Sequence, residues 1–311
     1  MAIGILSIIL TVLGLCLFET ISSIDNAVIN AEVLRTMYKR ARKWFLWWGI
    51  LIAVFLVRGL LPWLIIWIST PSLGFIGSLT ATFSSDPAVI KAIEISAPIL
   101  LMGGGVFLIF LFFHWLFLEE KEFGLHHERL FVQWGVWFYA VVSIILALLV
   151  WHALKQNPLI AFGAVVGSTA FFITHGFKQN AEKAEHQMVH GKSHLSDISK
   201  ILYLEIIDAT FSIDGVLGAF AFTLAIPLIL LGNGLGALVV RQLTVGNIER
   251  IKKYKYLKNG AMYSVLALGT IMISDSFGAH IPEFVSPIVT FIILGYFFYL
   301  SKKALNYSKP S

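Results

Sequence analysis

Long apolar runs separated by short polar segments make up most of the chain. A helix of roughly 20 residues crosses a bilayer core of about 30 Å, and about nine of the runs approach or exceed that length. They are residues 2–34, 44–68, 93–118, 130–152, 158–177, 201–225, 226–247, 259–279 and 284–301. Only a turn near Pro227 separates the sixth run from the seventh. The pattern predicts an all-α polytopic membrane protein with about nine transmembrane helices.

The composition agrees with this class. Of the 311 residues, 58% are hydrophobic and only 13% are charged, whereas a soluble domain carries about twice that charged fraction. The single cysteine, Cys16, lies in an apolar run, so neither a disulfide framework nor a cysteine metal site is expected. The first run lacks a basic region and a small-residue cleavage site. We therefore expect it to remain as a transmembrane helix.

Basic residues concentrate in alternate segments between the runs. These segments are residues 35–43, 121–129, 178–200, 250–258 and 302–309, whereas the intervening ones hold only Lys91 and Lys155. Cytoplasmic loops are the basic ones, so the N-terminus is expected outside and the C-terminus in the cytoplasm of a bacterial-type inner (plasma) membrane. The net charge of +5 comes from these loops. The expected partner is therefore the lipid bilayer, and no nucleic acid is expected.

Acidic residues interrupt the first and sixth runs in a repeated pattern. Ser-Ile-Asp occurs at residues 23–25 and again at residues 212–214, and a carboxylate precedes each aspartate by six residues. That carboxylate is Glu19 in the first copy and Asp208 in the second, which also holds Glu205. A charged side chain at membrane depth costs roughly 2.5 kcal/mol or more, so these residues are expected to have a function.

The two copies are expected to be inverted in the membrane. The first run passes from outside to inside and the sixth from inside to outside, as in transporters with inverted repeats and a substrate site at the midplane. Arg58 and Arg241 occupy similar positions in the runs that follow the two copies. The predicted organisation is a first three-helix repeat (1–118), linking spans with a His-bearing loop (119–200), a second inverted repeat (201–280) and a last span with a cytoplasmic tail (281–311).

If the two copies meet, their carboxylates share a small space of low dielectric constant and repel one another unless protonated or balanced by cations. Oxygen ligands suit manganese, calcium or magnesium better than copper or zinc, and carboxylates can also carry protons. The alternative is that the polar residues only join helices by hydrogen bonds. The predicted cation ligands are Glu19, Asp25, Asn26, Glu205, Asp208 and Asp214, with Ser23, Ser212, Arg58 and Arg241 in support.

The direction of the two aspartates stays open. On a regular helix, Asp25 lies about 120° around from Glu19, and Asp214 lies equally far from Asp208. Either the helices unwind near Asn26 and Gly215, as the broken helices of transporters do, or the aspartates face neighbours such as the two arginines.

Weaker signals lie outside the acidic motifs. His186, His190 and His194 recur at four-residue spacing and would line one face of a helix, where they could bind a transition metal. A solvated loop helix is the favoured interpretation. The acidic segment 119–128 is likewise expected to be solvated. Gly103-Gly104-Gly105 lies within a run, which predicts a helix-packing or hinge position.

At its motifs the sequence resembles the TerC family of membrane proteins, which is named for tellurium resistance and belongs to a lysine-exporter-like superfamily. The resemblance rests on Glu19-x-x-x-Ser23-x-Asp25-Asn26 and on Glu205-x-x-Asp208 leading to Asp214. It extends to Arg58-Gly59, Arg241, residues 256–260 (Tyr-Leu-Lys-Asn-Gly) and His280-Ile281-Pro282. Gly215 stands where a serine is expected. The resemblance implies export of manganese or a related divalent ion, bound by the acidic motifs as transported substrate, with no cofactor.

Two other functions are compatible with the same residues. The carboxylates could bind the ammonium groups of a cationic amino acid, or the protein could be a membrane scaffold that helps other proteins to mature or to acquire metal. No enzyme activity is expected, because the sequence holds no paired-histidine zinc motif and no serine–histidine arrangement.

Overall fold

The computed structural model describes residues 4–49, 70–81, 87–119, 121–126, 128–189, 196–246 and 253–307, with a few single positions between 52 and 68. Only the backbone is described at Asp25, Asn26 and Ser212. Arg58 and His194 lie outside the described residues, as do most of the predicted second span and the side chains of His186 and His190.

Within these residues the secondary structure is helical, without strands. The N-terminal helices are α1 (Ile5–Ser22), α2 (Ile24–Arg35), α3 (Lys39–Trp44) and the π-helix η1 (Phe45–Gly49). The next elements are a 3-10 turn (Pro71–Leu73), α5 (Gly74–Ala81), α6 (Pro87–Leu118), α7 (Glu128–Gln133), a second 3-10 turn (Gly135–Trp137), α8 (Phe138–Leu154) and α9 (Pro158–Val189). The chain continues with α10 (Asp197–Ala219), α11 (Ile226–Gly246), α13 (Leu257–Ser276) and α14 (Val285–Tyr307).

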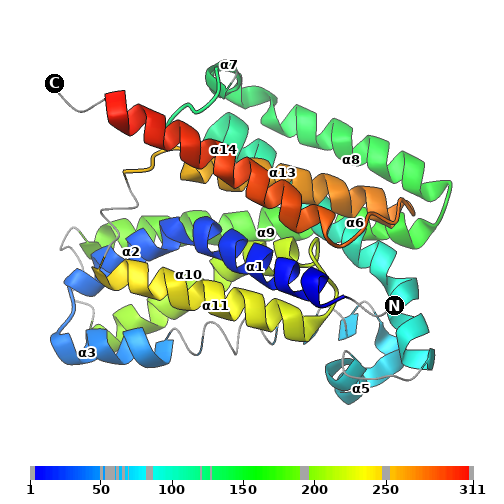
Figure 1. The fold of residues 1–311 in the computed structure, drawn as a ribbon, viewed down its shortest axis with the longest axis horizontal. Coiled ribbons are helices and arrows are strands. Elements are labelled where there is room, and N and C mark those ends of the chain that lie inside the picture. The colour runs from blue at the N-terminus through cyan, green and yellow to red at the C-terminus, as the bar shows by residue number, and fades with distance from the viewer. Residues whose placement is uncertain are drawn as a thin grey trace.

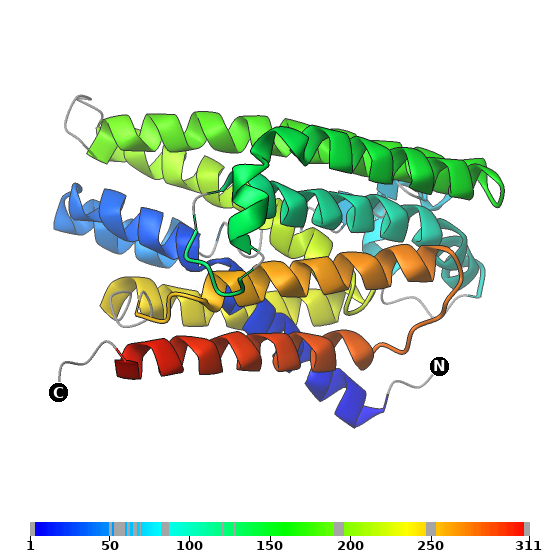
Figure 2. The same ribbon diagram turned by 90° about the horizontal axis from the view of Figure 1, so that it is seen from above.

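The long helices lie side by side along the longest axis of the molecule (Figures 1 and 2). Followed along the chain, α6, α8, α9, α10, α11, α13 and α14 alternate in direction. α1 begins at one end of this axis and α14 ends at the other. This arrangement is the one that successive membrane crossings require.

Five described helical segments are long and apolar enough to span a membrane: Ile5–Ser22, Ile95–Leu118, Gly135–Leu154, Pro158–Lys178 and Val285–Asn306. A shorter apolar helix covers Ile226–Gln242. The prediction of an all-α protein with membrane-spanning helices is confirmed at this level. The predicted turn near Pro227 is also confirmed, since α10 ends at Ala219 and α11 begins at Ile226.

The core forms around α6, whose side chains from Met102 to Phe117 are mostly buried. Because lipid is as apolar as these side chains, close packing rather than water exclusion must hold the helices together. The Gly103–Gly105 triplet allows it. A Cβ at Gly103 would lie 3.0 Å from the backbone oxygen of Gly163 in α9, and one at Gly105 would lie 3.0 Å from that of Gly269 in α13. The triplet is therefore a packing position.

We expect Gly167→Ala to destabilise the protein by about 1–3 kcal/mol, because overpacked cores lose stability on that scale. Its Cβ would overlap the carbonyl of Gly103 where α9 meets α6. Gly176→Ala in the same helix is the matched control. Nothing lies within 4 Å of its Cβ, so the change should be neutral or stabilising by up to about 1 kcal/mol. Unfolding in mixed micelles would measure both, and equal stability of the two variants would contradict the packing role.

Candidate functional site

Glycines bring α1 against α10 and α11. Cβ atoms at Gly218 of α10 and Gly232 of α11 would collide with the side chains of Phe18 and Leu15, respectively. Gly232 and Gly236 form a G-x-x-x-G pair, whose small residues let helix backbones approach closely in membranes. Where these helices meet, the first acidic motif lies against the second.

Among the acidic side chains of the two motifs that the structure describes, Glu19 is the most enclosed, with 1% of its surface exposed. Its Oε1 accepts a hydrogen bond from the Ser23 hydroxyl at 2.5 Å. A Cβ at Gly215 would lie 2.8 Å from its Oε2, and one at Gly236 would lie 2.7 Å from its Cβ and Cγ. Gly215 therefore makes room for the Glu19 carboxylate.

The first helix is interrupted by one residue. Ser23 separates α1 from α2 with φ −90° and ψ 5°, yet its N–H still bonds to Glu19 O at 3.1 Å and its carbonyl accepts from Ala27 N at 3.0 Å. The helix therefore breaks slightly before Asn26, whereas α10 continues through Gly215 without unwinding. Of the two explanations for the aspartates, unwinding fails for the second copy.

Glu19 and Asp214 line one cavity of about 40 Å³, which is room for a few water molecules. Its polar lining also includes Ser22, Ser23 and Glu119 together with two lysines, Lys178 of α9 and Lys258 of α13. Phe18, Leu111 and Val265 form the apolar part of the wall. The structure thus brings one carboxylate of each motif to a common space, and it adds charges that sequence reasoning did not assign.

Asp208 has a different neighbour. The side-chain amide of Asn30, in α2, donates to Asp208 Oδ1 at 3.0 Å and to Oδ2 at 3.1 Å. Asn30 is buried and was not among the predicted residues. The bond joins α2 to α10 at a second point, about two turns from Gly215 on the same face of α10. With Glu19 beside Gly215 and Asn30 beside Asp208, α1–α2 and α10 run antiparallel along this contact.

Glu205 and Arg241 lie near the π-helix η1 and do not line the cavity. Both oxygens of Glu205 are buried and make no hydrogen bond, and a Cβ at Gly49 would overlap its carboxylate. The guanidinium of Arg241 lies over the ring of Trp47, 4.2 Å from its centroid. This cation–π contact was not predicted from the sequence; a neighbouring aspartate was one of the two explanations left open.

An ion pair that lines the cavity joins the segment after α6 to α13. Lys258 Nζ lies 3.0 Å from Glu119 Oε2, and His114 Nδ1 lies 3.4 Å from Glu119 Oε1. The His114 ring contacts that of His175 with centroids 3.8 Å apart. Burial raises the pKa of Glu119, but His114 and the nearby lysines lower it more, so that the net pKa is well below its usual range.

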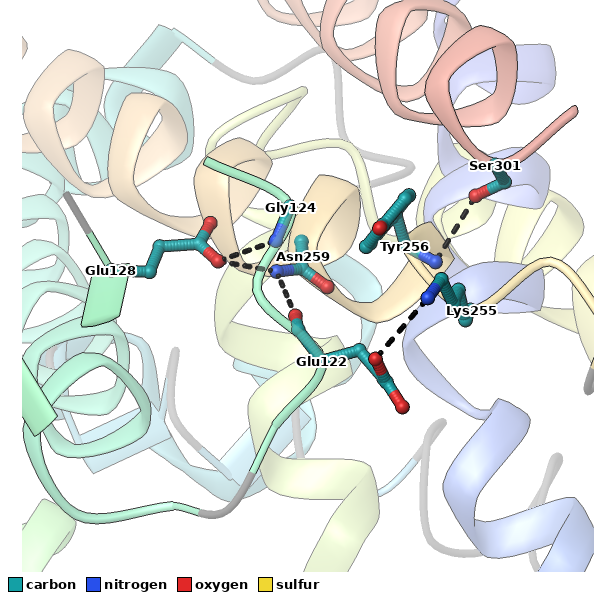
Figure 3. Close-up of polar contacts among 7 residues, drawn as sticks. All are labelled: Glu122, Gly124, Glu128, Lys255, Tyr256, Asn259 and Ser301. Atoms are coloured by element: carbon teal, nitrogen blue, oxygen red, sulfur yellow. Dashed lines mark hydrogen bonds and ion pairs between the residues drawn. The ribbon is translucent and has the colours of Figure 1, made fainter. Parts of the chain in front are cut away.

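The loop between α6 and α7 is fixed to the start of α13 (Figure 3). Glu128 Oε2 accepts from the Asn259 side chain at 2.9 Å and from Gly124 N at 2.8 Å, and Asn259 also donates to Glu122 O at 2.9 Å. Glu128 is completely buried. The prediction that this acidic segment is solvated is therefore wrong for Glu119 and Glu128, because Lys258 and Asn259, which are distant in sequence, bind them.

Residues 256–260 owe their pattern to these contacts. Lys258 pairs with Glu119, Asn259 bonds the loop, and Gly260 leaves room for Phe297 of α14. Near the far end of α13, Asp275 Oδ1 accepts from Ile281 N at 2.6 Å, which holds the turn containing His280. Residues 256–260 therefore reach the cavity through Lys258, whereas His280, Ile281 and Pro282 belong to a turn that Asp275 holds.

Among the side chains that the structure describes, no group of three or more His, Cys, Asp and Glu is gathered to hold a metal ion. Glu19, Asp214 and Glu119 share a cavity without converging on one point. Of the other predicted ligands, Asp208 and Glu205 lie elsewhere, and the side chains of Asp25 and Asn26 lie outside the description.

Comparison with known proteins identifies one family. Residues 24–306 match the family described as "Protein of unknown function (DUF475)". No curated protein and no solved structure gives a significant match. The matched region includes nearly all of the helices above.

Lys121, beside this site, should make the stability of the protein depend on pH. Burial lowers its pKa from 10.5 to about 8, although Glu128 and Glu119 oppose the shift. Its ammonium donates to Leu116 O at 2.6 Å, at the end of α6. Between those two pKa values the unfolded chain binds a proton that the folded chain has lost, so stability should rise with pH across that window.

We expect Lys121→Gln to lose this rise, as measured by thermal unfolding in detergent at pH 8 and pH 10. Lys303→Gln removes an exposed lysine of α14 and should keep it. The same pH dependence in Lys121→Gln and the wild type would contradict the assignment.

Proposed function

The chain belongs to the DUF475 family, and we propose that it is a membrane transporter that exports a divalent cation, with manganese as the favoured ion. The observation that carries the proposal is the cavity that Glu19 and Asp214 share. It contains a carboxylate from each of the two acidic motifs, one at the end of α1, which is long and apolar enough to cross a membrane, and one on α10. The cation would be transported substrate and not a resident cofactor.

The electrostatics of the cavity support a cationic substrate. Carboxylates in a space of low dielectric constant need positive charge nearby, and Lys178 and Lys258 supply it in the present conformation. A divalent cation could take the place of these ammonium groups during transport. The Glu19 and Asp214 carboxylates would then move together when the cation binds. They do not converge on one point in the present conformation.

The size of the cavity separates the proposal from its main rival. A volume of about 40 Å³ suits an ion with two or three waters, because one water needs roughly 10–15 Å³ of such cavity space. A cationic amino acid needs considerably more room. The geometry therefore favours an inorganic cation over an amino-acid exporter.

The proposed architecture is about nine spans with two inverted repeats. The antiparallel contact of α1–α2 with α10 supports it, as does the antiparallel packing of α6 against α13. These are the helix pairs that the repeats would relate. The opposite positions of the start of α1 and the end of α14 (Figure 1) agree with an odd number of crossings. The proposed orientation, with the N-terminus outside, rests on the basic loops.

The choice of manganese rests on the resemblance to the TerC family, because oxygen ligands alone accept calcium and magnesium equally. Asp25, Asn26 and Ser23 would complete the shell from the first motif, and Ser212 would do so from the second. Asp208 and Glu205 lie on the same helix as Asp214. Glu205, whose buried oxygens make no hydrogen bond, is suited to carry a proton. Arg58 would balance their charge together with Arg241.

Manganese flux into proteoliposomes tests the proposal. The wild type should transport Mn²⁺, and Asp214→Asn should abolish transport, because the substitution removes one of the charges that the cavity offers to the ion. Asp275→Asn, the same change outside the cavity, should retain transport. Parallel assays with Ca²⁺ and Mg²⁺ would identify the preferred ion. Absence of flux with every ion from folded wild-type protein would contradict the proposal and favour the scaffold function.

A further inference from the structure

The ion pair between Glu119 and Lys258 lines the cavity and belongs to neither acidic motif. Glu119 follows the last residue of α6, and Lys258 is in the first turn of α13. Their side chains are 21% and 37% exposed, respectively. Because both residues are partly exposed and also line the cavity with Glu19 and Asp214, the pair lies between solvent and those carboxylates.

We propose that this pair controls the entry of cations: Glu119 is the first carboxylate that an entering cation meets, and Lys258 is the counter-ion that the cation must displace. The inference rests on the proposed function for its substrate, but the control of access does not depend on it.

The charges explain why the pair would act in this way. The Glu119 carboxylate attracts cations, and the adjacent ammonium cancels that attraction while they remain paired. Exposed ion pairs are worth little because water and salt screen them. This pair is partly buried and joins two helices, so breaking it has a cost. Lysine is suited to such a role, since its single charge lies on a flexible four-carbon stem.

The packing of the helices favours movement of the side chain. α6 and α13 are held in close contact where Gly105 meets Gly269. Separation of the two helices would break that contact, whereas rotation of the Lys258 side chain would not. Opening therefore requires only a local change at the surface end.

A second lysine–glutamate pair in the same region provides a control. Lys255 Nζ lies 3.4 Å from Glu122 Oε2 (Figure 3). These side chains are more exposed, at 42% and 63%, and neither lines the cavity. The two pairs join the same segments, so only the one at the cavity should affect access.

The single cysteine makes a direct test possible. In a Cys16→Ser background, Ser22→Cys places one thiol in the cavity wall, because Ser22 lines it. The protein is purified into lipid nanodiscs without added metal, and its reaction with a small neutral methanethiosulfonate is followed by mass spectrometry. Lys258→Gln should react roughly tenfold faster than its parent, as loss of a coupled charge pair shifts equilibria by about this factor. Lys255→Gln should react at the parental rate.

Charge exchange separates access control from structural damage. The double variant Glu119→Lys with Lys258→Glu restores an ion pair and should return labelling to the slow rate. If Lys258→Gln does not elute as the parent does in gel filtration, Glu119→Gln removes the same pair and should show the same increase. Unchanged labelling in folded protein that lacks the pair would overturn the proposal, as would an equal increase in Lys255→Gln.

Addition of Mn²⁺ tests the substrate separately. Mn²⁺ should slow the labelling, and it should do so at a roughly tenfold lower concentration in Lys258→Gln than in Lys255→Gln, because no ammonium competes for Glu119. If the same Mn²⁺ concentration slowed labelling in both variants, the role of Lys258 as a competing counter-ion would be overturned. Faster labelling of Lys258→Gln without any protection by Mn²⁺, Ca²⁺ or Mg²⁺ would leave access control standing and would contradict the proposed transport of cations.

Discussion

The enclosure of the Glu19 carboxylate between helices is the constraint on which the rest of the site depends. A carboxylate at this depth is costly unless its surroundings supply hydrogen bonds or positive charge. Ser23 supplies a hydrogen bond, while Gly215 and Gly236 provide the space. The close approach of α1 to α10 and α11 follows from the same glycines. Where the helices meet, Asp214 reaches the cavity that Glu19 lines.

Several features could be predicted from the sequence because they are local. Apolar runs long enough to span a bilayer predicted membrane helices, and the structure has such helices. The repeated acidic motifs predicted that α1 and α10 belong together, and the Asn30–Asp208 bond and the shared cavity join them. The glycine triplet of α6 was predicted to be a helix-packing or hinge position, and the contacts with Gly163 and Gly269 support packing.

The remaining site residues could not be found in this way, because their importance depends on partners far away in the chain. Lys178 and Lys258 resemble other basic residues at the ends of apolar runs, and only the fold brings them to the cavity. Asn30 lies 178 positions from Asp208 and outside the repeated motif. The acidic segment after α6 resembled a solvated loop, since the sequence does not show that Asn259 bonds to Glu128 or that Lys258 pairs with Glu119.

Lys178 and Lys258 balance the carboxylates of this small cavity, and we propose that Lys258 also controls access to it. The cation would bind there between Glu19 and Asp214. Purified protein can be titrated with Mn²⁺ while the electron paramagnetic resonance signal of free Mn²⁺ is followed. We expect saturable binding that is lost in the Glu19→Gln/Asp214→Asn double variant. Equal binding by the double variant and the wild type, or none by the folded wild type, would contradict it.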